Sequence, residues 1–297
     1  MIETISVATD GSEAATAAER CAISLASRLR VGLGGITVVE DSRVRAPGDT
    51  GLTLPPFPEN ELAAYYRARA DAVARRFSER ARSEGLDVTC EVAQGQADDR
   101  IVEKSQSVGL LAIGRDGRSE SQHGALIGST TDSVIRKTSK SILVVPAGAS
   151  LGGPIVLGFD GSPGSRIAAG LAVDLANGLG EAVHVFVDSK DKGRAVARFE
   201  EVRSLVGGLA VPVREMSSTL GRPDVKIIDT ARESHAGLIV MGAFGRNRIT
   251  DYFLGSNAAA VVRTASMPVL RSQACPAVVP VNMAGPLKPA AAEGSMR

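Results

Sequence analysis

The stretch Ile5-Ser-Val-Ala-Thr-Asp10-Gly11-Ser12 recurs 150 residues further along the chain as Ile155-Val-Leu-Gly-Phe-Asp160-Gly161-Ser162. In both places a short apolar run ends at Asp-Gly-Ser, and apolar residues with helical spacing follow it. The helical stripe keeps the same offset, since Ala18, Ala22, Leu25 and Ala26 correspond to Ala168, Ala172, Leu175 and Ala176. The sequence therefore predicts one strand-turn-helix unit that occurs twice.

The repeat continues at a shorter offset. Residues 110–114 (LLAIG) match 238–242 (LIVMG), and 141–146 match 268–270, at an offset near 128 residues. The first copy therefore holds about 22 extra residues, which map to residues 41–65. Four prolines and two glycines in this segment cannot continue a helix or a central strand. We expect a long surface loop there.

Short apolar runs fall near residues 5–8, 36–39, 87–92, 110–113 and 142–145 in the first copy, and near 155–159, 183–187, 211–216, 238–241 and 268–270 in the second. Amphipathic stretches lie between them, in the first copy near 13–30, 60–84, 97–107 and 129–138. Such alternation indicates a mostly parallel sheet covered by helices on both faces. We predict an α/β protein of two tandem, doubly wound, five-stranded Rossmann-like domains, residues 1–147 and 154–272. Residues 147–153 form a short flexible linker, and the Pro- and Ala-rich residues 273–297 are expected to be a disordered tail.

Composition excludes several classes of function. The 34 basic and 33 acidic residues nearly cancel, so no strong field of one sign attracts a nucleic acid or an anionic membrane. The N-terminus lacks a signal pattern, and no apolar run reaches the length of a membrane span. Cys21, Cys90 and Cys275 are isolated, which fits a reduced compartment. We expect a cytoplasmic protein that binds neither nucleic acid nor membrane.

A glycine-rich loop follows the fourth strand of the second copy. It begins at Gly242 and Gly245, where glycine allows positive φ and close approach of a ligand, and it ends at Gly255-Ser256, where a helix opens. Helix N-termini attract phosphate through unpaired N–H groups and a partial positive charge. Arg246 and Arg248 could screen the outer phosphates; the alternative is that both arginines are only solvated. The alternative is that the glycines only make a turn and Ser256 only caps the helix.

Asp160 and Asp10 end the first strand of each copy. In a doubly wound sheet the first and fourth strands are neighbours, so each carboxylate should lie close to its glycine loop and could accept a hydrogen bond from a ribose hydroxyl. The alternative role is to cap the following helix through an Asp-Gly-Ser turn.

The chain carries little that points to fast catalysis. The loop lacks the lysine of a Gly-x-x-x-x-Gly-Lys-Ser motif, so phosphoryl transfer lacks its usual cation. His123, His184 and His235 have no metal-ligand spacing, and no Gly-x-Ser-x-Gly elbow follows a strand. Binding is favoured over turnover, and no catalytic residue or metal ligand is assigned.

These motifs resemble the universal stress protein family in its tandem form, over both halves as far as about residue 272. The family's ATP-binding subgroup carries Gly, two residues, Gly, nine residues, then Gly-Ser, and Gly242, Gly245, Gly255 and Ser256 have this spacing. The resemblance implies the adenine nucleotide alpha hydrolase-like fold and ATP as ligand, alone or with Mg²⁺. It places Asp160 at the ribose or adenine, Val185 beside the base, and Gly255, Ser256 and Asn257 at the phosphates.

The first copy departs from the family spacing. Ten residues, one more than the pattern, separate Gly117 from Gly128-Ser129, and Asp116 and Glu120 bring negative charge to the loop. Extra carboxylates near a triphosphate need a metal ion or oppose binding. We expect ATP mainly in the C-terminal domain and a weaker first site. The first-copy residues that correspond to the family's ligand contacts are Asp10, Val38, Gly114, Gly117, Gly128 and Ser129.

The resemblance also implies a regulator that offers a ligand-dependent conformation to an unknown protein partner. The two halves should pack through residues 142–145 and 268–270 about a pseudo-twofold axis, as an intramolecular pseudo-dimer that could itself form a homodimer. Two alternatives stay open: slow ATP hydrolysis or phosphotransfer, with Asp160 or Asp116 positioning metal or water, and a nucleotide-free scaffold in which the glycines are structural.

Overall fold

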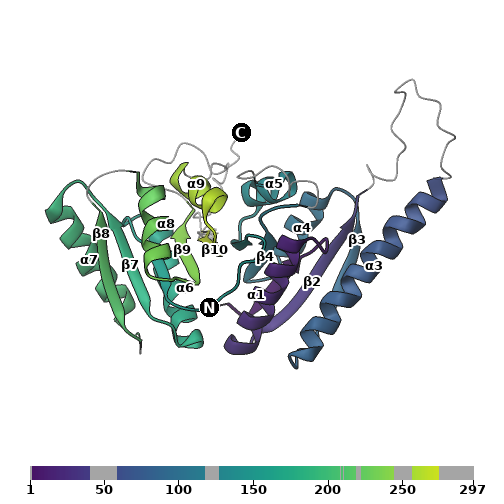
Figure 1. Cartoon of the computed structure of the whole chain (residues 1–297), viewed down its shortest axis with the longest axis horizontal. Coiled ribbons are helices and arrows are strands. Elements are labelled where there is room, and N and C mark those ends of the chain that lie inside the picture. Colours follow the sequence, from purple (N-terminus) through teal and green to yellow (C-terminus); the bar gives the residue numbers. More distant parts are fainter. Residues whose placement is uncertain are drawn as a thin grey trace, which may run out of the picture.

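All ten strands join one continuous sheet in the computed structural model, which describes residues 2–40, 59–117, 127–207, 209, 211–218, 222–243 and 256–273. The strand order is β3-β2-β1-β4-β5-β10-β9-β6-β7-β8, so β3 and β8 lie at the two ends of the sheet (Figure 1). Each half contributes one doubly wound block of five strands. This arrangement confirms the predicted fold class.

The first half consists of β1 (Thr4–Ala8), α1 (Glu13–Leu29), β2 (Gly32–Val39), α3 (Glu59–Ser83), β3 (Cys90–Gln94), α4 (Ala97–Ser105), β4 (Leu110–Gly114), α5 (Ser129–Lys137) and β5 (Ser141–Val145). The second half consists of β6 (Ile155–Gly158), α6 (Pro163–Leu179), β7 (Val183–Asp188), α7 (Lys192–Val206), β8 (Val213–Ser218), α8 (Pro223–Glu233), β9 (Leu238–Gly242), α9 (Ser256–Thr264) and β10 (Val269–Ser272).

Helices cover both faces of the sheet. One face packs on α1, α3, α6 and α7 through a core that includes Leu25, Phe77 and Leu175. The other face packs on α4, α5, α8 and α9 through residues such as Ile135 and Val261. Because the strands are buried on both faces, they need continuous apolar runs instead of alternation, which is the pattern that the sequence shows.

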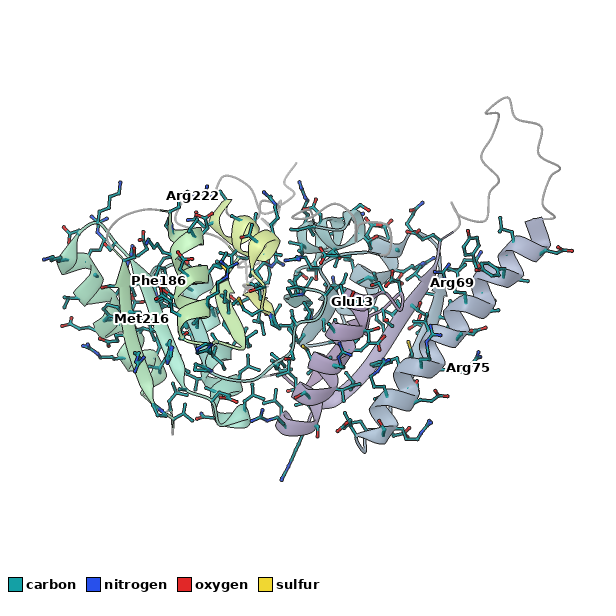
Figure 2. All side chains as sticks on the ribbon, viewed as in Figure 1. Glu13, Arg69, Arg75, Phe186, Met216 and Arg222 are labelled. Carbon is teal, nitrogen blue, oxygen red and sulfur yellow. The ribbon has the colours of Figure 1, made fainter. Side chains whose placement is uncertain are left out.

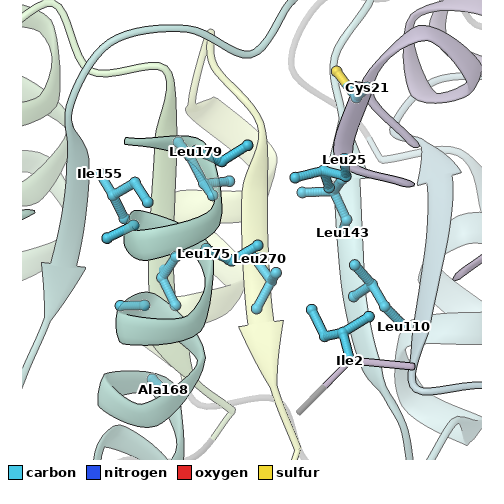
Figure 3. Close-up of a cluster of buried hydrophobic side chains, with 14 of the residues drawn as sticks. Ile2, Cys21, Leu25, Leu110, Leu143, Ile155, Ala168, Leu175, Leu179 and Leu270 are labelled. Atoms are coloured by element: carbon cyan, nitrogen blue, oxygen red, sulfur yellow. The ribbon is translucent and has the colours of Figure 1, made fainter. Parts of the chain in front are cut away.

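The two halves meet at the only antiparallel pairing among the described strands. Leu143 of β5 lies opposite Leu270 of β10, as expected for halves that pack through their last strands. Leu25, Leu175 and Leu179 extend this contact into one apolar cluster shared by α1 and α6 (Figure 3). The helices approach so closely that a Cβ at Gly178 would lie 2.1 Å from Cδ2 of Leu29.

A buried arginine also crosses this junction. Arg271 of β10 is 3% exposed, and its Nη1 donates a hydrogen bond to the carbonyl oxygen of Ile135 in α5 at 3.0 Å. Burial lowers the pKa of Arg271 from 12.5 to about 10. The guanidinium thus links the last strand of the second half to the last helix of the first.

Three predicted boundaries are corrected. The loop expected at 41–65 ends earlier, because α3 already begins at Glu59, and residues 41–58 lie outside the described part of the chain. The edge strands β3 and β8 begin two or three residues later than predicted, at Cys90 and Val213. Edge strands are covered on fewer sides, so their apolar runs define their ends poorly. The tail expected to be disordered also lies outside the described residues, apart from Gln273.

Candidate functional site

Asp10 and Asp160 form the same turn in the two halves. Oδ1 of each carboxylate accepts a hydrogen bond from a backbone N–H two residues on, that of Ser12 or Ser162, at 2.9 Å in both cases. Ser12 and Ser162 in turn cap α1 and α6. The helix-capping role considered from sequence is therefore present in both halves, and Asp10 also faces a cavity.

This cavity, of about 210 Å³, lies at the carboxyl ends of β1, β2 and β4 in the first half. Its wall contains all six residues that the family resemblance assigns to the first copy, namely Asp10, Val38, Gly114, Gly117, Gly128 and Ser129. They come together because β1 pairs with both β2 and β4, which brings three loops to one edge of the sheet. The corresponding pairings, β6 with β7 and β9, occur in the second half.

The N-terminus of α5 forms one end of the cavity. Gly128 is its N-cap and provides no side-chain capping bond, and Gly128 to Thr131 line the cavity. The first N–H groups of a helix have no acceptor within the helix itself. Thr131 Oγ1 donates to the carbonyl oxygen of Gly114 at 2.8 Å, and the N–H of Gly128 donates to that of Arg115 at 2.9 Å. These bonds fix the helix start against the end of β4. Such an arrangement suits a phosphate group.

The carboxylate of Asp116 in this wall is paired. Nε of Arg115 donates to its two oxygens at 3.0 and 3.2 Å. Nη1 of Arg115 also reaches the second half, where it donates to the carbonyl oxygens of Arg263 and Ala265 at 3.2 and 2.8 Å. The ion pair reduces the repulsion that Asp116 was expected to exert on a phosphate. Glu120, the second carboxylate expected to repel a phosphate, lies outside the described residues.

In the second half the structure describes only part of the predicted loop. Gly242 ends β9, and Ser256 and Asn257 begin α9, while Gly245, Arg246 and Gly255 lie outside the described residues.

Gly114 and Gly242, which end β4 and β9, do not have a positive φ. The expectation that Gly242 is glycine because its φ is positive is therefore wrong. A Cβ at Gly242 would lie 2.7 Å from backbone atoms of Gly164 and Ser165 in α6. A Cβ at Gly114 would lie 2.6 Å from the backbone nitrogen of Ala15 in α1. Glycine is required at both strand ends because a helix N-terminus packs directly on the strand.

The role assigned to Val185 is wrong. This residue is fully buried and packs on the face that carries α6 and α7, so it has no surface to offer a base. Val185 pairs with Leu157 in β6, and the equivalent residue of β1, Val7, pairs with Gly35. Val185 therefore corresponds to Gly35 and not to Val38. The residue that corresponds to Val38 is Asp188, three residues after Val185.

Two parts of the cavity wall were missed from sequence. Helix α3 contributes Tyr66, Arg69 and Val73 to the wall. Arg69 is labelled on this helix in Figure 2. Thr9 lines the cavity as well, and its Oγ1 donates to the buried carboxylate of Glu19 at 2.5 Å. The four-residue periodicity of α3 could have indicated its buried stripe, but no local signal in the sequence shows that this helix reaches a site at the end of β2.

The described cysteines are free thiols. Burial raises the pKa of Cys21 to about 11 and that of Cys90 to about 12, so both are neutral and weakly nucleophilic near pH 7. His184 is also buried, and burial followed by the charge of Arg214 lowers its pKa. Cys275 and His123 lie outside the described residues.

Within the described ranges, no helix combines the length and apolar character needed to cross a bilayer. In the same part of the chain, no three His, Cys, Asp or Glu side chains gather in the manner of a metal site.

Comparison with known proteins agrees with the fold and with the tandem repeat. The model of the universal stress protein family matches residues 1–146 and 153–271. A universal stress protein of Mycolicibacterium smegmatis is 29% identical over 205 residues, which cover 63% of this chain and 69% of that protein. The universal stress protein Rv1996 of Mycobacterium tuberculosis is 30% identical over 205 residues, covering 62% of this chain and 64% of its own length.

Among solved structures, a universal stress protein from Archaeoglobus fulgidus superposes with a TM-score of 0.74 and 19% identity, over 92% of this chain and 99% of that chain. At this identity the match shows that the fold is shared. Because the family model accounts for both halves of the molecule, the chain belongs to the universal stress protein family and carries two tandem copies of its domain.

Proposed function

We propose that this protein is a stress-response regulator that binds an adenine nucleotide, ATP, at the carboxyl edge of its sheet. The observation that supports this most is the first-half cavity, which joins the open N-terminus of α5 to Asp10 and Val38 in one wall. The phosphates would lie at α5, the ribose at Asp10 and the base beside Val38. The proposal includes a cytoplasmic location, where isolated thiols stay reduced.

The second half is proposed as a further phosphate-binding site. Its glycine spacing fits the family pattern without the extra residue of the first copy. Asp160 would lie beside this loop for the same reason as Asp10, since β6 pairs with β9 as β1 pairs with β4. Gly242, Ser256 and Asn257 lie at the two ends of that loop.

Holding the nucleotide is favoured over cleaving it. Of the carboxylates named as candidates to position metal or water, Asp116 is paired through both oxygens with Arg115, and the second-copy loop has no lysine to assist phosphoryl transfer. A slow ATPase remains the enzymatic alternative. The nucleotide-free scaffold has one specific observation in its favour, because the packing of α1 on Gly114 and of α6 on Gly242 explains both glycines without a ligand.

Mass spectrometry of nucleotide released from the purified, denatured protein tests the proposal. We expect an adenine nucleotide in the wild type and less of it in the variants Gly128→Asp and Gly255→Asp, which place a carboxylate at the phosphates of one copy each. Titration calorimetry should likewise show weaker ATP binding by each variant than by the wild type. No released nucleotide, together with no heat of ATP binding in the millimolar range, would favour the scaffold.

Prolonged incubation separates binding from turnover. Under single-turnover conditions we expect ATP to be recovered intact. Stoichiometric conversion to ADP that Asp116→Asn or Asp160→Asn abolishes would establish the enzymatic alternative instead.

A further inference from the structure

The two copies differ at the strand position that faces the cavity. Ala8 pairs with Ile36 in the first half, and Gly158 pairs with Phe186 in the second, so Ile36 and Phe186 are equivalent. Two residues further along each strand, on the same face, Val38 corresponds to Asp188. Both side chains are half-buried at the end of their strand. A valine in one copy is therefore a carboxylate in the other.

A second difference lies on the helix that follows. The buried positions of α3 and α7 have identical spacing, so the two helices can be aligned residue by residue: Ala70, Val73, Ala74, Phe77 and Ala81 correspond to Ala195, Arg198, Phe199, Val202 and Val206. In this alignment Val73, a buried residue of the cavity wall, corresponds to Arg198, which is 9% exposed. A second valine is thus replaced by a charged residue.

The two charged residues lie together. Nη1 of Arg198 donates to the backbone carbonyl oxygen of Asp188 at 2.7 Å. Arg198 therefore reaches the end of β7, as Val73 reaches the end of β2. The charged replacements occupy the same part of the fold as the two valines of the first-half cavity.

Among the described residues, the aromatic part of the wall on helix α3 has no counterpart on α7 either. Tyr66 of the first-half cavity corresponds to Asp191, which is the N-cap of α7 and accepts a hydrogen bond from the N–H of Arg194 at 2.7 Å. Helix α7 begins at this point, whereas α3 continues toward its N-terminus as far as Glu59. The turn of helix that carries Tyr66 is present in the first copy alone.

These differences bear on which copy can accept a nucleobase. A base presents a flat, weakly hydrated face, which packs well on valine and on an aromatic ring. The same face laid over the carboxylate of Asp188 would remove water from a negative charge without replacing its hydrogen bonds, which is unfavourable. Arg198, bonded to the end of β7, also fills space with a longer side chain than that of Val73.

We propose that base selectivity resides in the N-terminal copy, and that Asp188 and Arg198 exclude the base from the equivalent place in the C-terminal copy. This inference rests on the proposed nucleotide binding. The glycine spacing favoured the C-terminal copy as the main ATP site, whereas the residues that would contact the base favour the N-terminal copy. The two arguments differ because glycine spacing concerns the loop at the phosphates and this inference concerns the wall at the base.

Reciprocal substitutions test this assignment in two backgrounds. The variant Gly255→Asp leaves the N-terminal copy intact, and Gly128→Asp leaves the C-terminal copy intact. Calorimetric titration uses ATP and, as a probe without a base, inorganic tripolyphosphate. In the first background, Val38→Asp should weaken ATP binding about tenfold and change tripolyphosphate binding much less. In the second, the double variant Asp188→Val/Arg198→Val should strengthen ATP binding by a similar factor.

The outcomes separate the inference from the function on which it rests. If the wild type binds neither probe, the proposed nucleotide binding fails. If ATP binds but Val38→Asp has no effect, or if Asp188→Val/Arg198→Val weakens ATP or leaves it unchanged, the assignment of the base is overturned. Should Val38→Asp fail to fold, as judged by circular dichroism, Val38→Ala takes its place with an expected loss of about threefold, from removal of two methyl groups of contact.

Discussion

At the scale of single residues, the glycines of the site have more than one physical reason to be glycine. Gly114 leaves room for the backbone of α1, whereas a Cβ at Gly117 would meet no atom within 4 Å. Neither residue has a positive φ. Gly114 is therefore required by packing, while Gly117 is not required by any described neighbour.

These two glycines give a matched pair of variants. We expect Gly114→Ala to lower the free energy of unfolding by about 2–3 kcal/mol, because its Cβ would overlap backbone that cannot move without shifting α1. Gly117→Ala should change it by less than about 0.5 kcal/mol. Urea titrations followed by circular dichroism measure both. Equal stability of the two variants would show that α1 can adjust to the added methyl group.

Sequence reasoning at this scale succeeded where a residue is tied to the chain next to it. Asp10, Gly114, Gly128 and Ser129 follow strands or open helices, and their place at the sheet edge depends only on strand order. Val185 was misplaced because its position along β7 relative to β6 was not known. The register depends on partners in β6, and a single sequence does not contain that pairing.

At the scale of elements, a network of charges holds α5 against α4. Asp98 accepts hydrogen bonds from Ser133 and, at 2.6 Å, from Lys137, which also bonds Asp99 at 2.8 Å. The bond from Lys137, followed by that from Ser133, lowers the pKa of Asp98. Since the N-terminus of α5 is the proposed phosphate site, this network sets how firmly that site is held.

The stability contributed by Asp98 should depend on pH. A carboxyl whose pKa is lowered in the folded state stabilises the fold above its ordinary pKa of 3.8, and this stabilisation is lost as the pH falls through the lowered value. We expect Asp98→Asn to be less stable than the wild type at pH 7, with the difference shrinking in strong acid. Thermal unfolding at a series of pH values measures this.

Glu103→Gln provides the control, because Glu103 also pairs with a cation, Arg100, but its side chain is 70% exposed. The thermal stability of Glu103→Gln should equal that of the wild type at every pH. A deficit of Asp98→Asn that stays constant down to pH 2 would contradict the role of its charge.

The elements themselves were largely predictable, since each combines an apolar pattern with start and stop signals such as Ser12 and Gly180. The amphipathic stretch near 60–84 matches α3 (Glu59–Ser83), although the loop expected at 41–65 overlapped its first turn. The contribution of α3 to the cavity could not be predicted, because it depends on how far the helix extends past the end of β2.

At the scale of the whole molecule, Arg115 connects the two halves at the edge where both proposed sites lie. Its backbone holds Gly128 at the start of α5, its Nε pairs with Asp116, and its Nη1 bonds the C-terminal carbonyls of α9. One side chain therefore contacts the wall of the first site and the far end of the helix that begins at Ser256.

Removing this connection should affect nucleotide binding through charge. Arg115→Gln leaves Asp116 without its counter-ion, so we expect ATP affinity at the N-terminal copy to fall about tenfold at low salt and less at high salt, where screening weakens the repulsion. Adding Asp116→Asn should restore most of the loss. Calorimetry at two ionic strengths measures it. A loss that is independent of salt and is not rescued by Asp116→Asn would indicate a purely structural role.

The pairing of β5 with β10 affects which substitutions each copy can accept. Because Leu143 and Leu270 lie opposite each other on the pseudo-twofold axis, Arg271 occupies the position that Val144 occupies in the other copy. In a dimer of identical separate chains, any substitution appears on both sides of the axis, so a buried cation there would always be doubled. Joining the copies in one polypeptide removes that obligation. Each half can then acquire mutations that its partner does not share, and neither half need remain a suitable partner for a second copy of itself.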